Sequence, residues 1–173
     1  MNGDYLRGKR CYLSGPIEYS DIGINWRDAP TEILTKRYGI DLFDPFADPK
    51  QQWVPTLMKA KEDKNYDEMR RIAKSFVKKD LSMVTHSHLL VAYLPYKVPT
   101  TGTHHEIISA SDLKKPTLLV CPQGKHNVPL WYYGFIPHNN MFGSFEELYA
   151  RLDEINNGLH KDNDRWSLVY GLI

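Results

Sequence analysis

The chain has 173 residues, of which 42% are hydrophobic and 25% charged, as expected for one globular domain spanning 1–173. Its 22 Lys and Arg residues nearly balance its 21 Asp and Glu residues, which argues against nucleic acid or a charged membrane surface as a partner. No apolar run is long enough for a membrane span, and both cysteines, Cys11 and Cys121, lie in strand-like runs typical of buried free thiols. We therefore expect a cytoplasmic protein.

The amino-terminal part of the chain predicts two short strands separated by a helix. Residues 11–13 form an apolar strand that a Ser-Gly-Pro turn ends, and residues 40–43 form a second strand closed by Asp44 and Pro45. Between them, residues 25–38 carry apolar side chains at the spacing of one helix face.

The middle of the chain predicts a longer helix followed by a third strand. Residues 51–64 are polar and weakly periodic, and we expect an excursion with some helix there, which can act as a lid over a nearby site. A strong helical stripe runs from Met69 to Val84, and the apolar run 89–94 is a strand.

The carboxyl-terminal part continues the alternation. The predicted elements are a helix over 107–113, a strand over 116–120, a short strand near 140–142 and a last helix from a capping box at Ser144 to about residue 155. This order predicts an α/β fold, a doubly wound parallel five-stranded sheet with helices on both faces. The tail 159–173 is polar at first and apolar at its end, so we expect it to dock on its own subunit or on a neighbour.

The segment 100–106 is the most informative part of the chain. The sequence predicts a small-residue loop there after a buried strand, followed by a helix that carries Glu106 in its first turn. A helix amino terminus stabilises an ionised carboxylate, and ligands bind at the carboxyl ends of parallel strands. Covalent glycosyl transfer requires such a carboxylate. The alternative is that Glu106 only completes a capping box in which Thr103 is the cap.

Several other kinds of site are weakly supported. Adjacent histidines such as His104 and His105 point apart on a helix, and His86 and His88 lack a second ligand cluster, so we expect no metal. The basic residues of 59–79 alternate with acids at helical spacings, which favours a solvated helix face over a nucleic-acid groove. Neither a dinucleotide fingerprint nor a Walker motif occurs, and we expect no cofactor.

Three groups at predicted strand ends remain: Tyr12 on the first strand, Asp80 before the third and Glu106 after it. Tyr12 has an alternative role as a core residue, and Asp80 as an exposed helix residue. Together they would supply a nucleophile, a hydroxyl that orients it and a second acid for proton transfer. That division of labour suits cleavage of a glycosidic bond.

Four motifs in order resemble the nucleoside 2-deoxyribosyltransferase family. They are Tyr12-Leu13-Ser14-Gly15-Pro16-Ile17, Phe43-Asp44-Pro45-Phe46, Lys79-Asp80-Leu81, and Gly102-Thr103-His104-His105-Glu106 followed by Ala110. The resemblance implies a flavodoxin-like, Rossmann-like fold and a ping-pong exchange of nucleobases on a 2-deoxyribosyl group. It would make Glu106 the nucleophile, Tyr12 the residue that orients it and Asp80 the acid that contacts the base.

The resemblance also implies a homo-oligomer with shared active sites, in which a neighbour's amide completes each site. Asn139 or Asn140 matches that amide. The substrate-binding positions that we expect are Gly15, Ile17, Phe46, Thr100, Gly102, Asn139 and Asn140. Ile17, Phe46 and Trp26 are the candidates for stacking on the base, and each of them has an alternative role in the core.

One position departs from the family pattern. The nucleoside transferases usually carry an aspartate six residues before the nucleophile, where this chain has Thr100. The related 2'-deoxynucleoside 5'-phosphate N-hydrolases carry a hydroxyl residue there, which can donate to a phosphate that a carboxylate would repel. Against hydrolysis, Glu18 stands where those hydrolases tend to have phosphate-binding residues. Transfer, nucleotide hydrolysis and nucleotide binding without turnover are therefore the three hypotheses.

Overall fold

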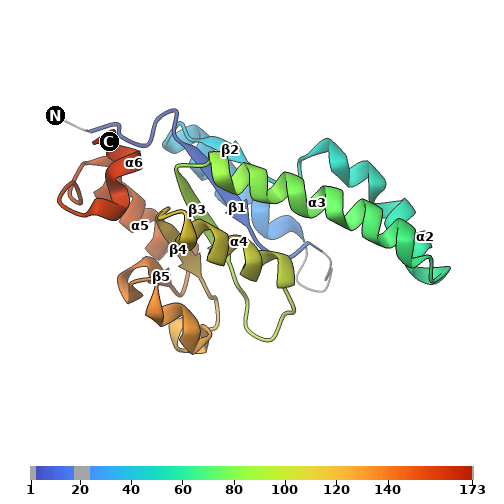
Figure 1. Cartoon of the computed structure of the whole chain (residues 1–173). Coiled ribbons are helices and arrows are strands. Elements are labelled where there is room, and N and C mark those ends of the chain that lie inside the picture. Colours follow the sequence, from blue (N-terminus) through green and yellow to red (C-terminus); the bar gives the residue numbers. More distant parts are fainter. Residues whose placement is uncertain (1–2, 18–23, 173) are drawn as a thin grey trace.

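A parallel sheet runs through the centre of the molecule (Figure 1). The computed structural model describes residues 3–17 and 24–172. The strands are β1 (Arg10–Ser14), β2 (Asp41–Phe43), β3 (Leu89–Tyr93), β4 (Thr117–Val120) and β5 (Met141–Phe142). All four strand pairs are parallel, and the order is β2-β1-β3-β4-β5. This is the doubly wound, flavodoxin-like order, so the predicted fold class is confirmed.

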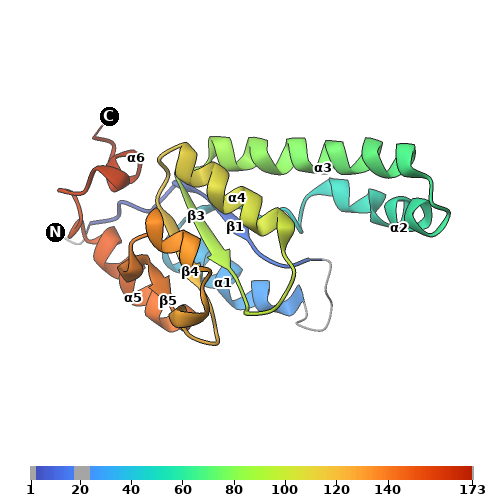
Figure 2. The same cartoon turned by 60° about the horizontal axis from the view of Figure 1, so that its bottom comes forward.

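Helices cover both faces of the sheet. Figure 2 shows α3 and α4 on one side and α1 and α5 on the other. The bounds are α1 (Asp28–Glu32), α2 (Val54–Glu62), α3 (Tyr66–His86), α4 (Thr101–Asp112), α5 (Phe145–Asn156) and α6 (Ser167–Tyr170). A 3-10 turn precedes α1 and a π-helical turn follows it, so the predicted helix 25–38 is present but irregular.

Alternation along β1 divides its side chains between two cores. Cys11 and Leu13 belong to the core under α5 and α6, whereas Tyr12 belongs to the core under α3 and α4. Because side chains alternate along a strand, Ser14 faces the same way as Tyr12. Both hydroxyls at the carboxyl end of β1 therefore point to the side where α4 lies.

Helices α2 and α3 pair with each other beyond the edge of the sheet (Figure 2). At 21 residues α3 is about 30 Å long, and its first half packs against α2 instead of the strands. Of the predicted apolar stripe, Ile72 and Val84 are buried whereas Val77 is exposed. The polar excursion predicted over 51–64 is largely α2. Within the described residues, no helix is long and apolar enough to cross a membrane.

The start of α4 corrects one expectation. The helix begins at Thr101 with Thr100 in the N-cap position, and no acid lies in its first turn. Thr103 is therefore not the cap, and Glu106 is not a capping-box acid, because its side chain is engaged elsewhere. At α5, by contrast, the Ser144 hydroxyl accepts from the Glu147 amide at 3.3 Å, as the capping-box pattern predicts.

The carboxyl-terminal tail packs on its own chain. Trp166 is fully buried and joins the core under α5, together with Val169 and Tyr170. The Tyr170 hydroxyl donates to the carbonyl of Ile155 at 3.0 Å, and its ring meets that of Tyr5 edge-on at 5.2 Å.

Trp166→Ala is expected to lower the free energy of unfolding by about 3–5 kcal/mol, because it removes a large buried ring. Leu172→Ala, at a side chain that is 59% exposed, is the control and changes it by less than about 0.5 kcal/mol. Urea denaturation measures both. Equal midpoints for the two variants would contradict the packing of the tail.

Candidate active site

Glu106 lies where α4 passes the carboxyl end of β1. Its carboxylate is buried, with the residue 8% exposed. One oxygen accepts a hydrogen bond from the Tyr12 hydroxyl at 2.8 Å, and the other accepts one from the Ser14 hydroxyl. Two donors spaced two residues apart on one strand thus fix both oxygens of a single carboxylate.

The hydroxyl of Tyr12 is a permanent donor at this site. Burial and the negative charge of Glu106 raise the pKa of Tyr12 well above its ordinary value, so its proton stays in place at physiological pH. Sequence reasoning identified Tyr12 and Glu106, and the structure brings them into contact. Sequence reasoning did not identify Ser14 as a partner of Glu106. The signal was available, because side chains alternate along a strand and Ser14 therefore faces the same way as Tyr12.

Arg27 connects the ends of β1 and β2 beneath the site. Its guanidinium is buried and donates to the carbonyls of Leu13 and Gly15 at 3.1 and 3.0 Å. It also pairs with the Asp44 carboxylate at 2.8 Å. Burial lowers the pKa of Arg27, and Asp44 is the strongest of the negative charges that oppose this shift. No sequence motif had singled out Arg27, since its partners are mostly backbone atoms.

Trp26 is a packing residue beside the Ser-Gly-Pro turn. Its ring stacks on Tyr93 with centroids 4.7 Å apart and on Phe145 at 6.2 Å. Its edge lies against Gly15, where a Cβ would overlap the ring. Trp26 therefore explains why glycine is needed there, and its stacked neighbours argue against the base-stacking role that was expected for it.

Asp80 of α3 pairs with a buried lysine. The Lys50 ammonium, on the 3-10 turn Pro49–Trp53, contacts the Asp80 carboxylate, and the two side chains are 6% and 19% exposed. Burial lowers the pKa of Lys50 to about 8, and the charges of Asp48 and Glu106 oppose this shift. Lys50 is thus the counter-ion of Asp80. Nothing in the polar sequence around Lys50 had indicated this role.

The other expected substrate-binding residues differ in their surroundings. Thr100 is buried and its hydroxyl has no hydrogen-bond partner, whereas Gly102 faces open space. Ile17 is half-buried. Phe46 is 36% exposed and lines an open groove of about 480 Å³ with Arg27 and Asp44 among its other walls. Glu18 lies outside the described residues.

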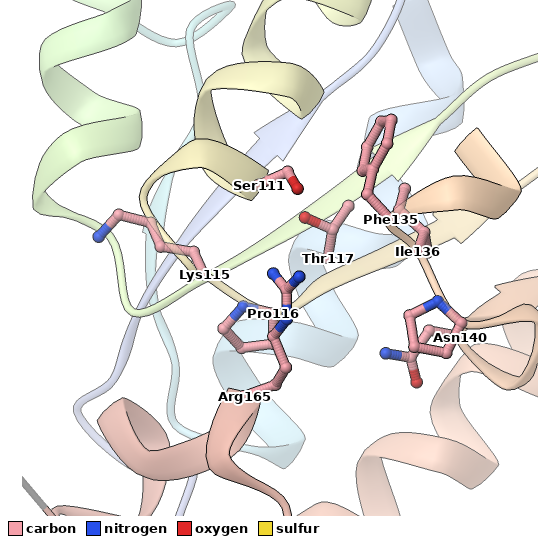
Figure 3. Close-up of a pocket in the computed structure, with 9 residues that line it drawn as sticks. Ser111, Lys115, Pro116, Thr117, Phe135, Ile136, Asn140 and Arg165 are labelled. Carbon is pink, nitrogen blue, oxygen red and sulfur yellow. The ribbon is translucent and has the colours of Figure 1, made fainter. Parts of the chain in front are cut away.

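The two asparagines near β5 are placed differently from each other. Asn139 is exposed. Asn140 is buried and lines a small cavity of about 10 Å³ together with Thr117 and Arg165 (Figure 3). The Asn140 and Thr117 side-chain oxygens lack partners there, and the space suits a single water. This cavity lies at the amino end of β4, so it is remote in topology from the carboxyl-end site of Glu106.

Histidines and acids do not gather into a metal site in the part of the chain that the structure describes. His104 contacts the Tyr132 hydroxyl through Nδ1, and burial lowers the pKa of this histidine. His88 accepts a hydrogen bond from the Arg10 amide at 2.9 Å. Both histidines therefore have structural partners.

Comparisons with known proteins identify the family and the fold of the chain. The sequence model described as nucleoside 2-deoxyribosyltransferase matches residues 11–157, so the chain belongs to that family. A solved 2-deoxyribosyltransferase from Bacillus psychrosaccharolyticus aligns with a TM-score of 0.58 and 16% identity, over 80% of this chain and 89% of that one. A 2-deoxyribosyltransferase from Leishmania mexicana aligns with a TM-score of 0.52 and 18% identity, over 84% and 97%. These likenesses establish the fold. A comparison with curated proteins gave no match.

Arg27→Met is expected to destabilise the protein by about 3–5 kcal/mol, because it leaves Asp44 and two strand-end carbonyls without their buried donor. Lys36→Met breaks a surface pair with Glu32, whose side chains are 76% and 62% exposed, and costs less than about 1 kcal/mol. Thermal unfolding compares the two variants. A stable Arg27→Met protein would show that Arg27 does not brace the strand ends.

Proposed function

We propose that this protein cleaves the N-glycosidic bond of a 2'-deoxynucleoside and transfers the 2-deoxyribosyl group to another nucleobase. The observation that carries the proposal is the buried Glu106 carboxylate, oriented by the hydroxyls of Tyr12 and Ser14 at the carboxyl end of β1. Family membership over residues 11–157 supports the same chemistry.

Glu106 acts as the nucleophile in this mechanism. One carboxylate oxygen attacks C1' as the bond from C1' to the base nitrogen breaks, and the negative charge stabilises the oxocarbenium character that develops at C1'. The product is a glycosyl ester of Glu106. An incoming base then attacks C1' and releases the carboxylate. Tyr12 and Ser14 hold the carboxylate in place, so little reorganisation is needed on attack.

The pair of Asp80 and Lys50 serves the nucleobase. Asp80 contacts the base, and the pair supplies the proton that the departing base takes up. Gly15, Ile17, Phe46, Thr100 and Gly102 bind the substrate around the sugar and the base.

We further propose a cytoplasmic homo-oligomer in which Asn139 reaches the site of a neighbouring subunit. Asn139 is exposed and Asn140 is buried, so Asn139 is the better candidate for that amide. The same segment between β4 and β5 carries Leu130 and Trp131, which are 84% and 79% exposed. Large exposed apolar side chains of this kind are typical of an interaction surface.

Hydrolysis of a 2'-deoxynucleoside 5'-monophosphate is the second candidate function. In that reaction water replaces the acceptor base and Glu106 keeps its role. The specific observation in its favour is Thr100. Its buried hydroxyl has no partner among the residues that the structure describes, and it is available to donate to a phosphate oxygen.

Glu106→Gln is expected to lower turnover by at least about 10³-fold while the fold is kept, because the amide is a poor nucleophile. The assay is chromatography of bases and nucleosides after incubation with each deoxynucleoside and 5'-monophosphate, with and without an added base. New deoxynucleosides that form only with an acceptor identify the transferase.

Free base released only from monophosphates identifies the hydrolase instead. If no incubation yields a free base or a new deoxynucleoside, the remaining hypothesis is nucleotide binding without turnover. Glu146→Gln, at an exposed residue of α5, is the matched control and keeps wild-type turnover. Near-wild-type turnover by folded Glu106→Gln would eliminate Glu106 as the nucleophile.

Thr100→Asp is expected to shift preference from 5'-monophosphates toward nucleosides by about tenfold or more, because a carboxylate repels the phosphate at short range. The measurement is the ratio of kcat/KM for a deoxynucleoside and its 5'-monophosphate. Thr100→Val removes the hydroxyl without adding charge and should shift the ratio less. An unchanged ratio in Thr100→Asp would place the 5' group away from residue 100.

A further inference from the structure

Ser14 donates to Glu106 from a fully buried position at the end of β1. Its hydroxyl contacts one carboxylate oxygen, while the Tyr12 hydroxyl contacts the other at 2.8 Å. Tyr12 also fills space in the core under α3 and α4. Ser14 is small, and among the described residues the hydrogen-bond partner of its hydroxyl is Glu106. The chemical effect of this hydroxyl is therefore an effect on that carboxylate.

The backbone on both sides of Ser14 is held in place. The buried guanidinium of Arg27 donates to the carbonyls of Leu13 and Gly15, the residues before and after Ser14, at 3.1 and 3.0 Å. Ser14 itself lies opposite Ala92 in the parallel pair of β1 and β3. Because its neighbours are fixed, Ser14 keeps its hydroxyl beside the carboxylate when the charge on that carboxylate changes.

The first half-reaction leaves this hydrogen bond nearly unchanged. Glu106 is an anion before it attacks C1', and it keeps most of its charge in the transition state, because glycosidic cleavage passes through an oxocarbenium-like state. A hydrogen bond that is equally strong in the ground state and the transition state does not alter the rate. Formation of the glycosyl ester therefore depends little on the Ser14 hydroxyl.

The second half-reaction starts from a different charge. In the glycosyl ester Glu106 is neutral, and a hydrogen bond to a neutral oxygen is about half as strong as one to a carboxylate. The negative charge returns to Glu106 as its bond to C1' breaks, so the hydrogen bond from Ser14 strengthens on the way to the transition state. Interactions that strengthen in this way accelerate a reaction.

We propose that Ser14 is the positioning residue that makes Glu106 a good leaving group and so sets the rate at which the glycosyl ester is resolved. The inference rests on the proposed function. The acceptor nitrogen, or a water oxygen, bonds to C1' while the bond from C1' to the Glu106 oxygen breaks and its electron pair stays on the carboxylate. The N–H or O–H proton of the acceptor passes to the pair of Asp80 and Lys50. Ser14 keeps its own proton throughout.

Transfer and hydrolysis share the departure of Glu106. A donor that stabilises the departing carboxylate therefore accelerates both reactions to the same extent. It follows that loss of the Ser14 hydroxyl slows the resolution of the ester by a base and by water alike, and leaves the ratio of the two products unchanged.

Ser14→Ala removes the donor and tests the proposal. Each protein is mixed without an acceptor base with the substrate that the wild type cleaves, a 2'-deoxynucleoside or its 5'-monophosphate. Rapid quenching follows the free base, and mass spectrometry of the intact protein measures the glycosylated fraction. Excess adenine is then added, and the decay of the ester is timed. Ser75→Ala, the same change at an exposed residue of α3, is the matched control and behaves as wild type.

Ser14→Ala is expected to form the ester at a rate within about twofold of the wild-type rate. It should lose the ester about tenfold more slowly, the difference between a hydrogen bond to a charged and to a neutral oxygen. The ester then accumulates, and free base appears in a burst before a slow steady phase. Because resolution of the ester limits turnover, kcat and KM for the donor fall together and kcat/KM stays close to wild type. Ser14→Cys, which carries a weak S–H donor, should lie between the two.

Two results would overturn the assignment of Ser14. Equal slowing of both half-reactions in Ser14→Ala would show that Ser14 only keeps Glu106 in place, and decay of the ester at the wild-type rate would show that its hydrogen bond does not serve the departing carboxylate. A wild-type protein that releases no base, or releases it while neither protein becomes glycosylated, would instead refute the proposed function, so the two failures are distinguishable.

Discussion

The hydrogen bonds from Tyr12 and Ser14 to Glu106 are the interaction on which the site depends. They join α4 to the carboxyl end of β1, two elements separated by about half the chain. A carboxylate removed from water this far needs strong donors, and two hydroxyls from one strand supply them. The same contacts hold both oxygens of the carboxylate beside the carboxyl end of β1.

The charges around Glu106 are organised in two buried pairs. Arg27 with Asp44 holds the ends of β1 and β2 together on one side, and Lys50 with Asp80 connects α3 to the turn before α2 on the other. Each pair is close to neutral, and the hydrogen-bond donors to the Glu106 carboxylate are the hydroxyls of Tyr12 and Ser14.

The hairpin of α2 and α3 gives the site its second side. Its outer half extends beyond the sheet (Figure 1). Asp80 of α3 pairs with Lys50 on the turn before α2. The segment 51–64, which the sequence analysis expected as a lid, directly follows Lys50 and is largely α2.

The sequence by itself predicted the fold class, which the structure confirms, and it singled out Glu106 as the candidate acid of the site. Alternating apolar runs and amphipathic segments specify strands and helices locally. Tyr12 lies on β1, near the strand ends where parallel sheets bind ligands, whereas Asp80 lies within α3 and Glu106 within α4. Only the tertiary structure decided that α4 begins at Thr101, because helix ends depend on competing caps and on packing. Only the tertiary structure identified Ser14, Arg27 and Lys50 as parts of the site. Ser14 contacts the distant Glu106 carboxylate, Arg27 donates to backbone carbonyls, and Lys50 pairs with a residue on α3. Such contacts depend on how elements pack and leave no periodic trace in the chain.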